Sequence, residues 1–149
     1  MQSFCINLAP RKCKRAMESI ENIKEAGLKL TPQRIAVYKS MMKLRHAKLD
    51  EIVDDLKREY DNLTLSTVYR VLDSFCAAGL LSLVSHPDTG ECYYDITAHN
   101  HHHVFDGNKI MDYNDDDLTR LVREYIKEKH PEIDDIEKIQ VQITLNNKH

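Results

Sequence analysis

Apolar side chains recur every three or four residues through four segments in the first half of the chain, a spacing that gives each segment one apolar helical face. The segments predicted as amphipathic helices are residues 16–26, 32–45, 51–60 and 67–78. Thr31 before a proline is predicted to cap the second helix, and Ser66 to cap the fourth. Gly79 follows the fourth helix, as glycine often does at a helix end.

Two strand-like runs, 80–86 and 91–96, follow these helices and are separated by the turn sequence Pro87-Asp88-Thr89-Gly90. Helices followed by a hairpin in this order indicate a winged helix-turn-helix, whose last helix enters the major groove of DNA with its first residues nearest the bases. The residues this assigns to DNA are Ser66, Thr67, Tyr69 and Arg70. The open alternative is that Tyr69 packs on the hairpin and Arg70 pairs with Asp73.

The last third of the chain has a different pattern. A short strand is predicted over 109–113, and a helix follows the carboxylates of 115–117, which suit a helix start. The residues predicted to form its buried stripe are Leu118, Leu121, Val122, Tyr125 and Ile126. Strict alternation of Ile139, Val141, Ile143 and Leu145 predicts a final antiparallel strand over 136–145. Two strands and one helix bury little surface, so this part is expected to form a homodimer.

Composition fits a folded cytoplasmic protein, because 42% of the 149 residues are apolar, 30% are charged and no stretch is predicted to be a secretory signal or a membrane span. The net charge of −3 hides an uneven distribution, since residues 11–45 hold 10 basic and 3 acidic side chains. Such a stretch suits DNA phosphates, although a plain solvated surface is an alternative. The four cysteines form no C-x-x-C pair, and the role of Cys5 and Cys13 stays open.

Half of the eight histidines lie in one stretch, Asp95-Ile-Thr-Ala-His-Asn-His-His-His103. If its end is extended, His101 and His103 point to the same face, because side chains alternate along a strand. Two neutral imidazoles beside carboxylates suit iron(II), manganese(II) or zinc(II). The alternative is a solvated histidine run without a ligand.

Several motifs stand out along the chain: Leu30-Thr-Pro-Gln-Arg34, the lone His46, Leu65-Ser-Thr-Val-Tyr-Arg-Val-Leu72, Ala78-Gly-Leu80, Tyr94-Asp95 and the run through His103. Together they resemble the ferric uptake regulator family of bacterial metal-dependent repressors. The resemblance implies an α+β protein, with a winged helix-turn-helix DNA-binding domain over 1–95 and a small α/β dimerisation and metal-binding domain over 96–149. Thr31, Gln33 and Arg34, in the first motif, are expected to contact DNA as well.

The resemblance also implies a ligand set for one divalent metal ion per subunit. Carried over by position, the ligands are His46, Asp95, His101, His103 and Asp112. Iron(II) is the metal we expect, with zinc(II) and manganese(II) as alternatives. The chain departs from the family in lacking two C-x-x-C pairs, so a four-cysteine structural zinc is excluded. A second exchangeable site stays open, because Asn100 and His102 occupy its alternate positions but the last strand has no histidine.

The expected function is therefore a metal-dependent, iron-responsive, dimeric repressor that binds palindromic double-stranded operator DNA. A peroxide-sensing repressor is an alternative, because Asp112 is an aspartate, as in that branch of the family, where iron sensors commonly have glutamate. A DNA-binding dimer that needs no metal is another alternative. A metallohydrolase is not expected, because the sequence offers no general base near the histidines.

Overall fold

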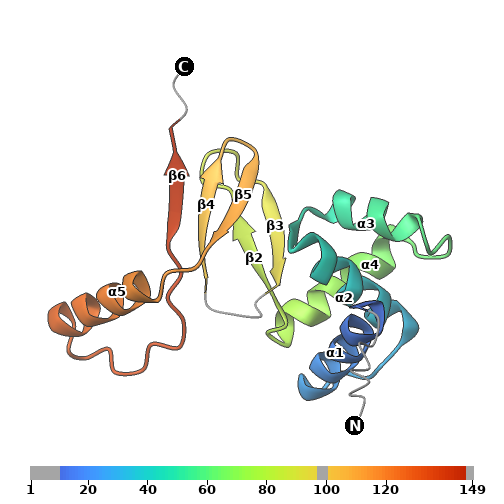
Figure 1. Cartoon of the computed structure of the whole chain (residues 1–149), viewed down its shortest axis with the longest axis horizontal. Helices are drawn as coiled ribbons and strands as arrows, with labels where there is room; N and C mark the ends of the chain where they lie inside the picture. The colour runs from blue at the N-terminus through green and yellow to red at the C-terminus, as the bar shows by residue number, and fades with distance from the viewer. Residues whose placement is uncertain (1–10, 97–100, 147–149) are drawn as a thin grey trace, which may run out of the picture. The chain divides into compact units, whose positions relative to one another are not determined.

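The computed structural model describes residues 11–96 and 101–146 (Figure 1). Cys5, His99 and Asn100 lie outside these residues, and the side chain of Cys13 is not described. The chain divides into two compact units. The first comprises Met1–Ser85 and Glu91–Thr97, and the second comprises His86–Gly90 and Ala98–His149.

Four helices make up most of the first unit. They are α1 (Arg11–Glu25), α2 (Pro32–Leu44), α3 (Leu49–Lys57) and α4 (Leu65–Ala77). Thr31 caps α2 as predicted, its Oγ1 accepting a hydrogen bond from the Arg34 N–H at 3.3 Å. The predicted cap of α4 is wrong, because Ser66 is already helical and Thr64 holds the extended cap position. The Thr64 Oγ1 accepts from the Thr67 N–H at 3.3 Å.

A small antiparallel sheet completes this unit, with the strand order β1-β3-β2. Its strands are β1 (His46–Ala47), β2 (Leu81–Ser85) and β3 (Cys92–Ile96). Strand β1 was not predicted, because two residues are too few to show an alternating pattern. It nevertheless matters for the site, since it places His46 opposite Asp95.

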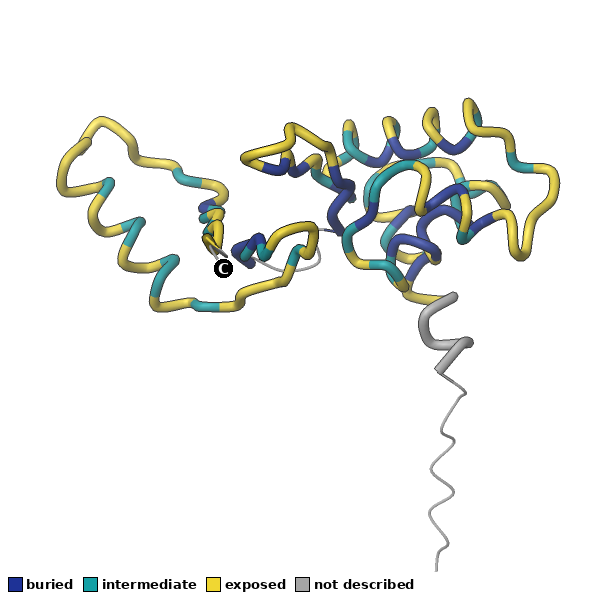
Figure 2. Tube along the Cα trace, turned by 90° about the horizontal axis from the view of Figure 1, so that it is seen from above, coloured by how far each residue is buried: buried dark blue, intermediate teal, exposed yellow. Residues whose placement is uncertain are grey.

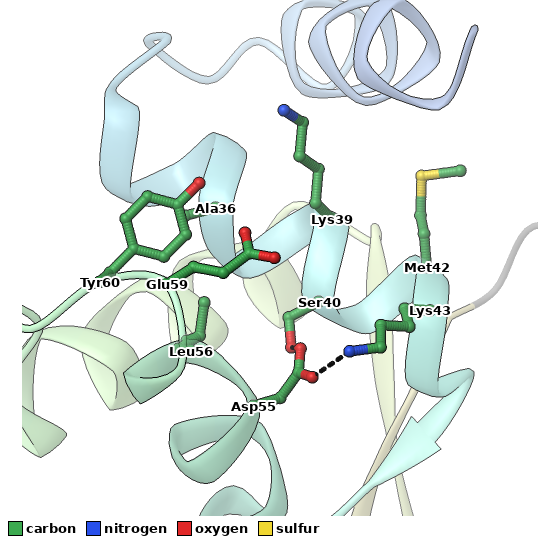
Figure 3. Close-up of a pocket in the computed structure, with 9 residues that line it drawn as sticks. All are labelled: Ala36, Lys39, Ser40, Met42, Lys43, Asp55, Leu56, Glu59 and Tyr60. Carbon is green, nitrogen blue, oxygen red and sulfur yellow. Dashed lines mark hydrogen bonds and ion pairs between the residues drawn. The ribbon is translucent and has the colours of Figure 1, made fainter. Parts of the chain in front are cut away.

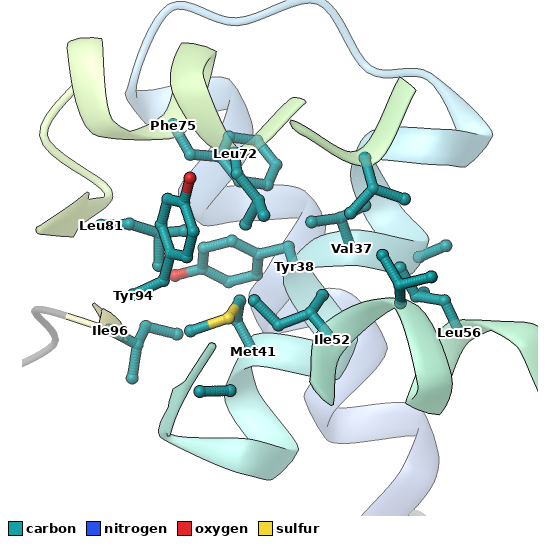
Figure 4. Packing of buried hydrophobic residues seen from close by; sticks show 14 of the residues in the cluster. Val37, Tyr38, Met41, Ile52, Leu56, Leu72, Phe75, Leu81, Tyr94 and Ile96 are labelled. Atoms are coloured by element: carbon teal, nitrogen blue, oxygen red, sulfur yellow. The ribbon is translucent and has the colours of Figure 1, made fainter. Parts of the chain in front are cut away.

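One hydrophobic core joins the helices to the sheet, as Figure 4 shows. Tyr38 of α2 meets Phe75 of α4 edge to face, with ring centroids 5.7 Å apart. Met41, Ile52 and Leu72 are fully buried around this pair. The packing of α2, α3, α4 and the β2–β3 hairpin forms a winged helix-turn-helix, so the predicted α+β class is confirmed.

The second unit contains a three-stranded sheet and one helix. Its elements are β4 (His102–Asp106), β5 (Lys109–Tyr113), α5 (Asp116–Lys129) and β6 (Gln142–Leu145), and the strand order is β5-β4-β6. The prediction of a final antiparallel strand is wrong, because β6 pairs with β4 in parallel. The long connection through α5 makes this possible, since parallel neighbours need a crossover of a dozen or more residues. The strand is also shorter than predicted, and Ile139 is buried just before it.

The stripe of α5 is not buried as predicted. No residue of α5 is buried, so the helix is drawn in teal and yellow in Figure 2. Leu121 and Tyr125 are 65% and 61% exposed. The sheet of this unit has only three short strands, and Leu118, Val122 and Ile126 of the helix are half-buried. Exposed apolar surface on this scale indicates a protein partner.

His86 organises the turn between β2 and β3. Its Nδ1 accepts hydrogen bonds from the backbone N–H groups of Asp88 and Thr89 at 3.2 and 3.3 Å. The Nε2–H therefore donates to the Gly107 carbonyl at 2.9 Å, and the ring lies edge to face against Phe105. These contacts place the turn residues in the second unit, whereas β2 and β3 belong to the first.

Candidate metal centre and nucleic-acid interface

A two-residue turn fixes the pairing of β4 with β5. Gly107 has a φ of 58° and, with Asn108, connects Asp106 to Lys109, which face each other across the hairpin. Glycine at the first position of such a turn allows a backbone twist that matches the twist of the strands. The resulting register places Asp112 directly opposite His103.

Three of the five predicted ligands converge in the second unit. His101 Nε2 lies 3.2 Å from His103 Nε2 and 3.5 Å from Asp112 Oδ1. His103 Nε2 lies 4.0 Å from the same carboxylate oxygen. The two imidazoles are 5% and 1% exposed, whereas the Asp112 side chain is 23% exposed. The donor atoms thus gather at one point, and the carboxylate is the most exposed of the three groups.

These spacings fit a common ion. Ligand atoms that surround an ion tetrahedrally at 2.0–2.1 Å are about 3.3 Å apart from each other. The observed separations of 3.2, 3.5 and 4.0 Å need only small movements to reach that geometry. Two imidazoles and one carboxylate are also donors that iron(II), zinc(II) and manganese(II) accept.

The other two predicted ligands form a pair in the first unit. The pairing of β1 with β3 puts His46 opposite Asp95, and their ligand atoms lie within 4.8 Å of each other. The Asp95 side chain is buried, with the residue only 1% exposed, while His46 is half-buried. A buried carboxylate requires compensating donors or cations, and a divalent ion is one such cation.

His102 faces away from this cluster and is fully engaged with the protein. Its Nδ1 accepts from the Val141 N–H at 3.0 Å, so its Nε2–H donates to Thr119 Oγ1 at 2.9 Å. The Thr119 hydroxyl in turn donates to the Asp115 carbonyl at 3.2 Å. Since both ring nitrogens have protein partners and the residue is 1% exposed, His102 is not available to a second metal ion.

Sequence reasoning missed one polar contact of the metal cluster. The side-chain amide nitrogen of Gln140, just before β6, lies 3.1 Å from His103 Nδ1. The backbone of the next residue holds the same strand, because the His103 N–H donates to the Val141 carbonyl at 3.0 Å. The alternating pattern places Gln140 on a polar face, but no feature of the sequence points it at a histidine in another strand.

The start of α4 presents an exposed face, as expected for DNA contact. Ser66 and Arg70 are exposed, and Tyr69 is 55% exposed. Among the described residues Arg70 forms no ion pair with Asp73 or any other acid. Thr67 is half-buried, with its hydroxyl 2.9 Å from that of Thr64. Leu65, which sequence reasoning did not single out, is 57% exposed on this face.

The residues of the first motif have local tasks. Besides the cap formed by Thr31, the Arg34 guanidinium donates from Nη1 to the Lys29 carbonyl at 2.7 Å. This bond folds the Arg34 side chain back along the loop that precedes α2. Gln33 is exposed, so of these three residues its side chain is the most accessible to a ligand.

A cavity of about 250 Å³ between α2 and α3 contains none of the predicted site residues. In Figure 3, Asp55 of α3 points toward Ser40 and Lys43 of α2. The Ser40 hydroxyl donates to Asp55 at 2.7 Å, and Lys43 forms an ion pair with it. Burial opposes ionisation of Asp55, but these two donors outweigh it and lower the pKa of the carboxyl group. These polar groups therefore bind each other across the two helices, and we do not assign a ligand to the cavity.

Two of the cysteines can be described. Cys76 of α4 is half-buried, and burial raises the pKa of its thiol, which makes it a poor nucleophile at neutral pH. Cys92 of β3 is exposed. None of the helices in the described part of the chain is long and apolar enough to cross a membrane.

Comparisons with known proteins agree on one family. The family model described as the ferric uptake regulator family matches residues 25–143. The peroxide-responsive repressor PerR of Staphylococcus aureus is 29% identical over 109 residues, which span 71% of this chain and 73% of that protein.

Two solved structures share the fold. The ferric uptake regulator from Pseudomonas aeruginosa with manganese has a TM-score of 0.72 and 23% identity, covering 88% of this chain and 98% of that one. The Campylobacter jejuni peroxide stress regulator has a TM-score of 0.68 and 24% identity, covering 89% of this chain and 96% of that one.

Proposed function

The chain belongs to the ferric uptake regulator family, and from that premise we propose that it is a metal-dependent, iron-responsive repressor that binds palindromic operator DNA as a homodimer. Its membership makes it a transcriptional regulator and not an enzyme. We propose the cytoplasm as its place of action. The observation that carries the proposal is the convergence of His101, His103 and Asp112 in a protein that also exposes the start of α4.

Residues 1–95 form the DNA-binding domain and residues 96–149 the dimerisation and metal-binding domain in this proposal. His46 and Asp95 come from the first, whereas His101, His103 and Asp112 come from the second. One divalent ion held by all five would neutralise the two carboxylates and tie the domains together. Iron(II) is the proposed ion, and zinc(II) or manganese(II) would use the same donors.

The five ligands would couple metal binding to DNA binding through domain arrangement. Only an arrangement that brings both ligand groups to the same ion satisfies them all. Metal binding therefore shifts the population toward that arrangement, by as much as the two arrangements differ in metal affinity. In a dimer, this sets the spacing of the two α4 helices against two half-sites of the operator.

The exposed face of α4 offers two kinds of contact to DNA. Arg70 and Ser66 supply hydrogen-bond donors for base edges or phosphates. Leu65 and Tyr69 supply exposed apolar surface, which suits the methyl group of thymine in the major groove. The basic side chains in the first third of the chain add attraction that does not depend on sequence.

Dimerisation would cover the apolar face of α5. Leu121 and Tyr125 lie one helical turn apart and are both largely exposed, and Leu145 in the edge strand β6 is 44% exposed. A second copy would cover these side chains and pair the free edge of β6 across a two-fold axis.

Operator binding with and without metal tests the function. Double-stranded DNA selected by the protein from a random-sequence pool with Mn²⁺ present serves as the probe. We expect tight binding with Mn²⁺ or anaerobic Fe²⁺ and its loss in a chelator. His101→Ala or His103→Ala should abolish the metal dependence without unfolding the dimer. His130 is exposed just after α5, so His130→Ala is the control and should keep the metal dependence. Equal binding in chelator would favour a metal-independent repressor.

A further inference from the structure

The two ring nitrogens of His103 have separate partners. The Nε2 atom faces the ligand cluster, 3.2 Å from His101 Nε2 and 4.0 Å from Asp112 Oδ1. The Nδ1 atom lies 3.1 Å from the side-chain amide of Gln140. His103 is 1% exposed and Gln140 is half-buried, so bulk water competes little for this contact. The metal-facing and protein-facing sides of the ring are therefore distinct.

The chemistry of a neutral imidazole links these two sides. A ring that gives the lone pair of Nε2 to a metal ion carries its proton on Nδ1, and that proton needs an acceptor. The amide of glutamine can present either its NH₂ group or its carbonyl oxygen at the same place after a half-turn about its last torsion. With its carbonyl oxygen toward the ring, Gln140 accepts a hydrogen bond from Nδ1–H, and the lone pair of Nε2 can then bind the ion.

Backbone contacts hold Gln140 in position for this task. The neighbouring Val141 accepts a hydrogen bond from the His103 N–H at 3.0 Å and donates to His102 Nδ1 at the same distance. The residue directly after Gln140 is therefore fixed to β4 through both its N–H and its carbonyl group. Only the last torsion of Gln140 has to change for it to serve either tautomer of His103.

We propose that Gln140 is a positioning residue that selects the metal-binding tautomer of His103, an inference that rests on the proposed function. Its amide fixes the ring orientation and accepts a hydrogen bond from Nδ1–H while Nε2 binds the ion. Partners of this kind, when removed from metal-binding histidines, typically cost about 10- to 100-fold in metal affinity. Gln140 is thus expected to matter for metal binding although it touches no ion.

Two variants of the full-length protein separate this role from simple packing. Gln140→Met keeps the length of the side chain and removes its hydrogen bond, so Zn²⁺ and Mn²⁺ affinity in competition titrations should fall about 10- to 100-fold. Gln140→Glu can only accept from Nδ1–H, so affinity should be kept or increased. Gln142 is exposed two residues later, and Gln142→Met and Gln142→Glu control for side-chain loss and for the added charge.

A spectroscopic measurement reports the tautomer itself. In ¹⁵N-histidine-labelled, Zn²⁺-loaded protein, the Nδ1–H of His103 should give a slowly exchanging signal in the wild type and in Gln140→Glu. In Gln140→Met that signal should exchange rapidly. Unchanged affinity in Gln140→Met, or equal weakening in both Gln140 variants, would overturn the positioning role. A His103→Ala variant that binds Zn²⁺ as tightly as the wild type would instead overturn the proposed function.

Discussion

His102 and Thr119 are joined by a hydrogen bond of 2.9 Å between Nε2 and Oγ1, which fastens β4 to α5 within the second unit. The other nitrogen of the ring accepts from the Val141 N–H, which fastens the same strand to the segment before β6. Neighbouring side chains on a strand point to opposite faces, so the middle histidine of the run builds the fold while His101 and His103 face the metal cluster. The strand that carries the cluster is therefore held by the two hydrogen bonds of His102.

This arrangement predicts one metal ion per subunit and a purely structural role for Thr119. Thr119→Val removes the hydroxyl at nearly constant shape, so the free energy of unfolding should fall by about 1 kcal/mol. The amount of Zn²⁺ bound, measured by elemental analysis, should stay at one equivalent. Thr144→Val, at an exposed position of β6, is the matched control and should change neither quantity. Two equivalents in the wild type, with one lost in His102→Ala, would contradict the prediction.

Arg70 is expected to dominate the sequence-specific part of DNA binding. Its side chain is exposed near the start of α4, and losing a base contact typically costs about 1 to 3 kcal/mol. Arg70→Ala should therefore weaken operator binding by that amount in titrations with metal present. Affinity of the wild type should also fall steeply with salt, because basic side chains release counterions from the phosphates.

An exposed arginine of the second unit provides the control for this measurement. Arg120 pairs with Asp117 on α5. Arg120→Ala therefore also removes one positive charge, but from a helix that is not the one assigned to DNA. It should reduce affinity only slightly. If Arg70→Ala binds the operator as tightly as the wild type, α4 is not the recognition helix.

Asp55 should make the first unit less stable in acid. Its pKa is lowered in the folded state despite burial, because Lys43 and Ser40 donate to the carboxylate. The stabilisation is therefore complete above the unfolded-state value of about 3.9 and is lost as pH falls through the lower folded-state pKa. In urea titrations, Asp55→Asn should lower stability by about 1 to 2 kcal/mol at pH 7 and by less near pH 3. Asp54 is exposed on the same helix, so Asp54→Asn is the control. Its stability should differ little from that of the wild type at either pH.

Local patterns predicted most elements, because they depend on neighbours in sequence. The cap of Thr31 and the helical periodicity of α2 and α4 are such local features. The parallel pairing of β6 depends on the path of a long connection, which no local pattern encodes. The exposure of Leu121 was missed for a different reason, since an apolar stripe has the same pattern whether it is buried within its own chain or against a second one.

The candidate ligands were also predictable only in part. Alternation placed His101 and His103 on one face, and their side chains do converge. Asp112 was assigned as a ligand only through resemblance to the family. Its position opposite His103 depends on the hairpin register set by Gly107, which alternation alone does not give. Neither the alternating pattern nor the family resemblance predicted the role of Gln140, since its contact with His103 joins residues 37 positions apart.

Peroxide sensing is the second candidate function, and two observations favour it. Asp112 is an aspartate, and the Staphylococcus aureus relative that is 29% identical is a peroxide-responsive repressor. Iron(II) held by imidazoles can promote the oxidation of a ligand ring, in which one hydrogen peroxide adds one oxygen atom to the imidazole and leaves one water. An oxidised ring binds the ion poorly, so the repressor would release its operator.

Mass spectrometry of the iron-loaded protein after a modest excess of peroxide distinguishes the two candidates. A peroxide sensor should gain 16 Da, the mass of one oxygen atom, on His46 or His101 and should lose operator binding in step with that gain. The Mn²⁺-loaded protein is the control and should stay unmodified, because manganese(II) does not promote this oxidation. Asp112→Glu, which adds one methylene to the ligand, should slow the modification. Unmodified histidines and intact operator binding in the iron-loaded protein would leave iron-responsive repression as the function.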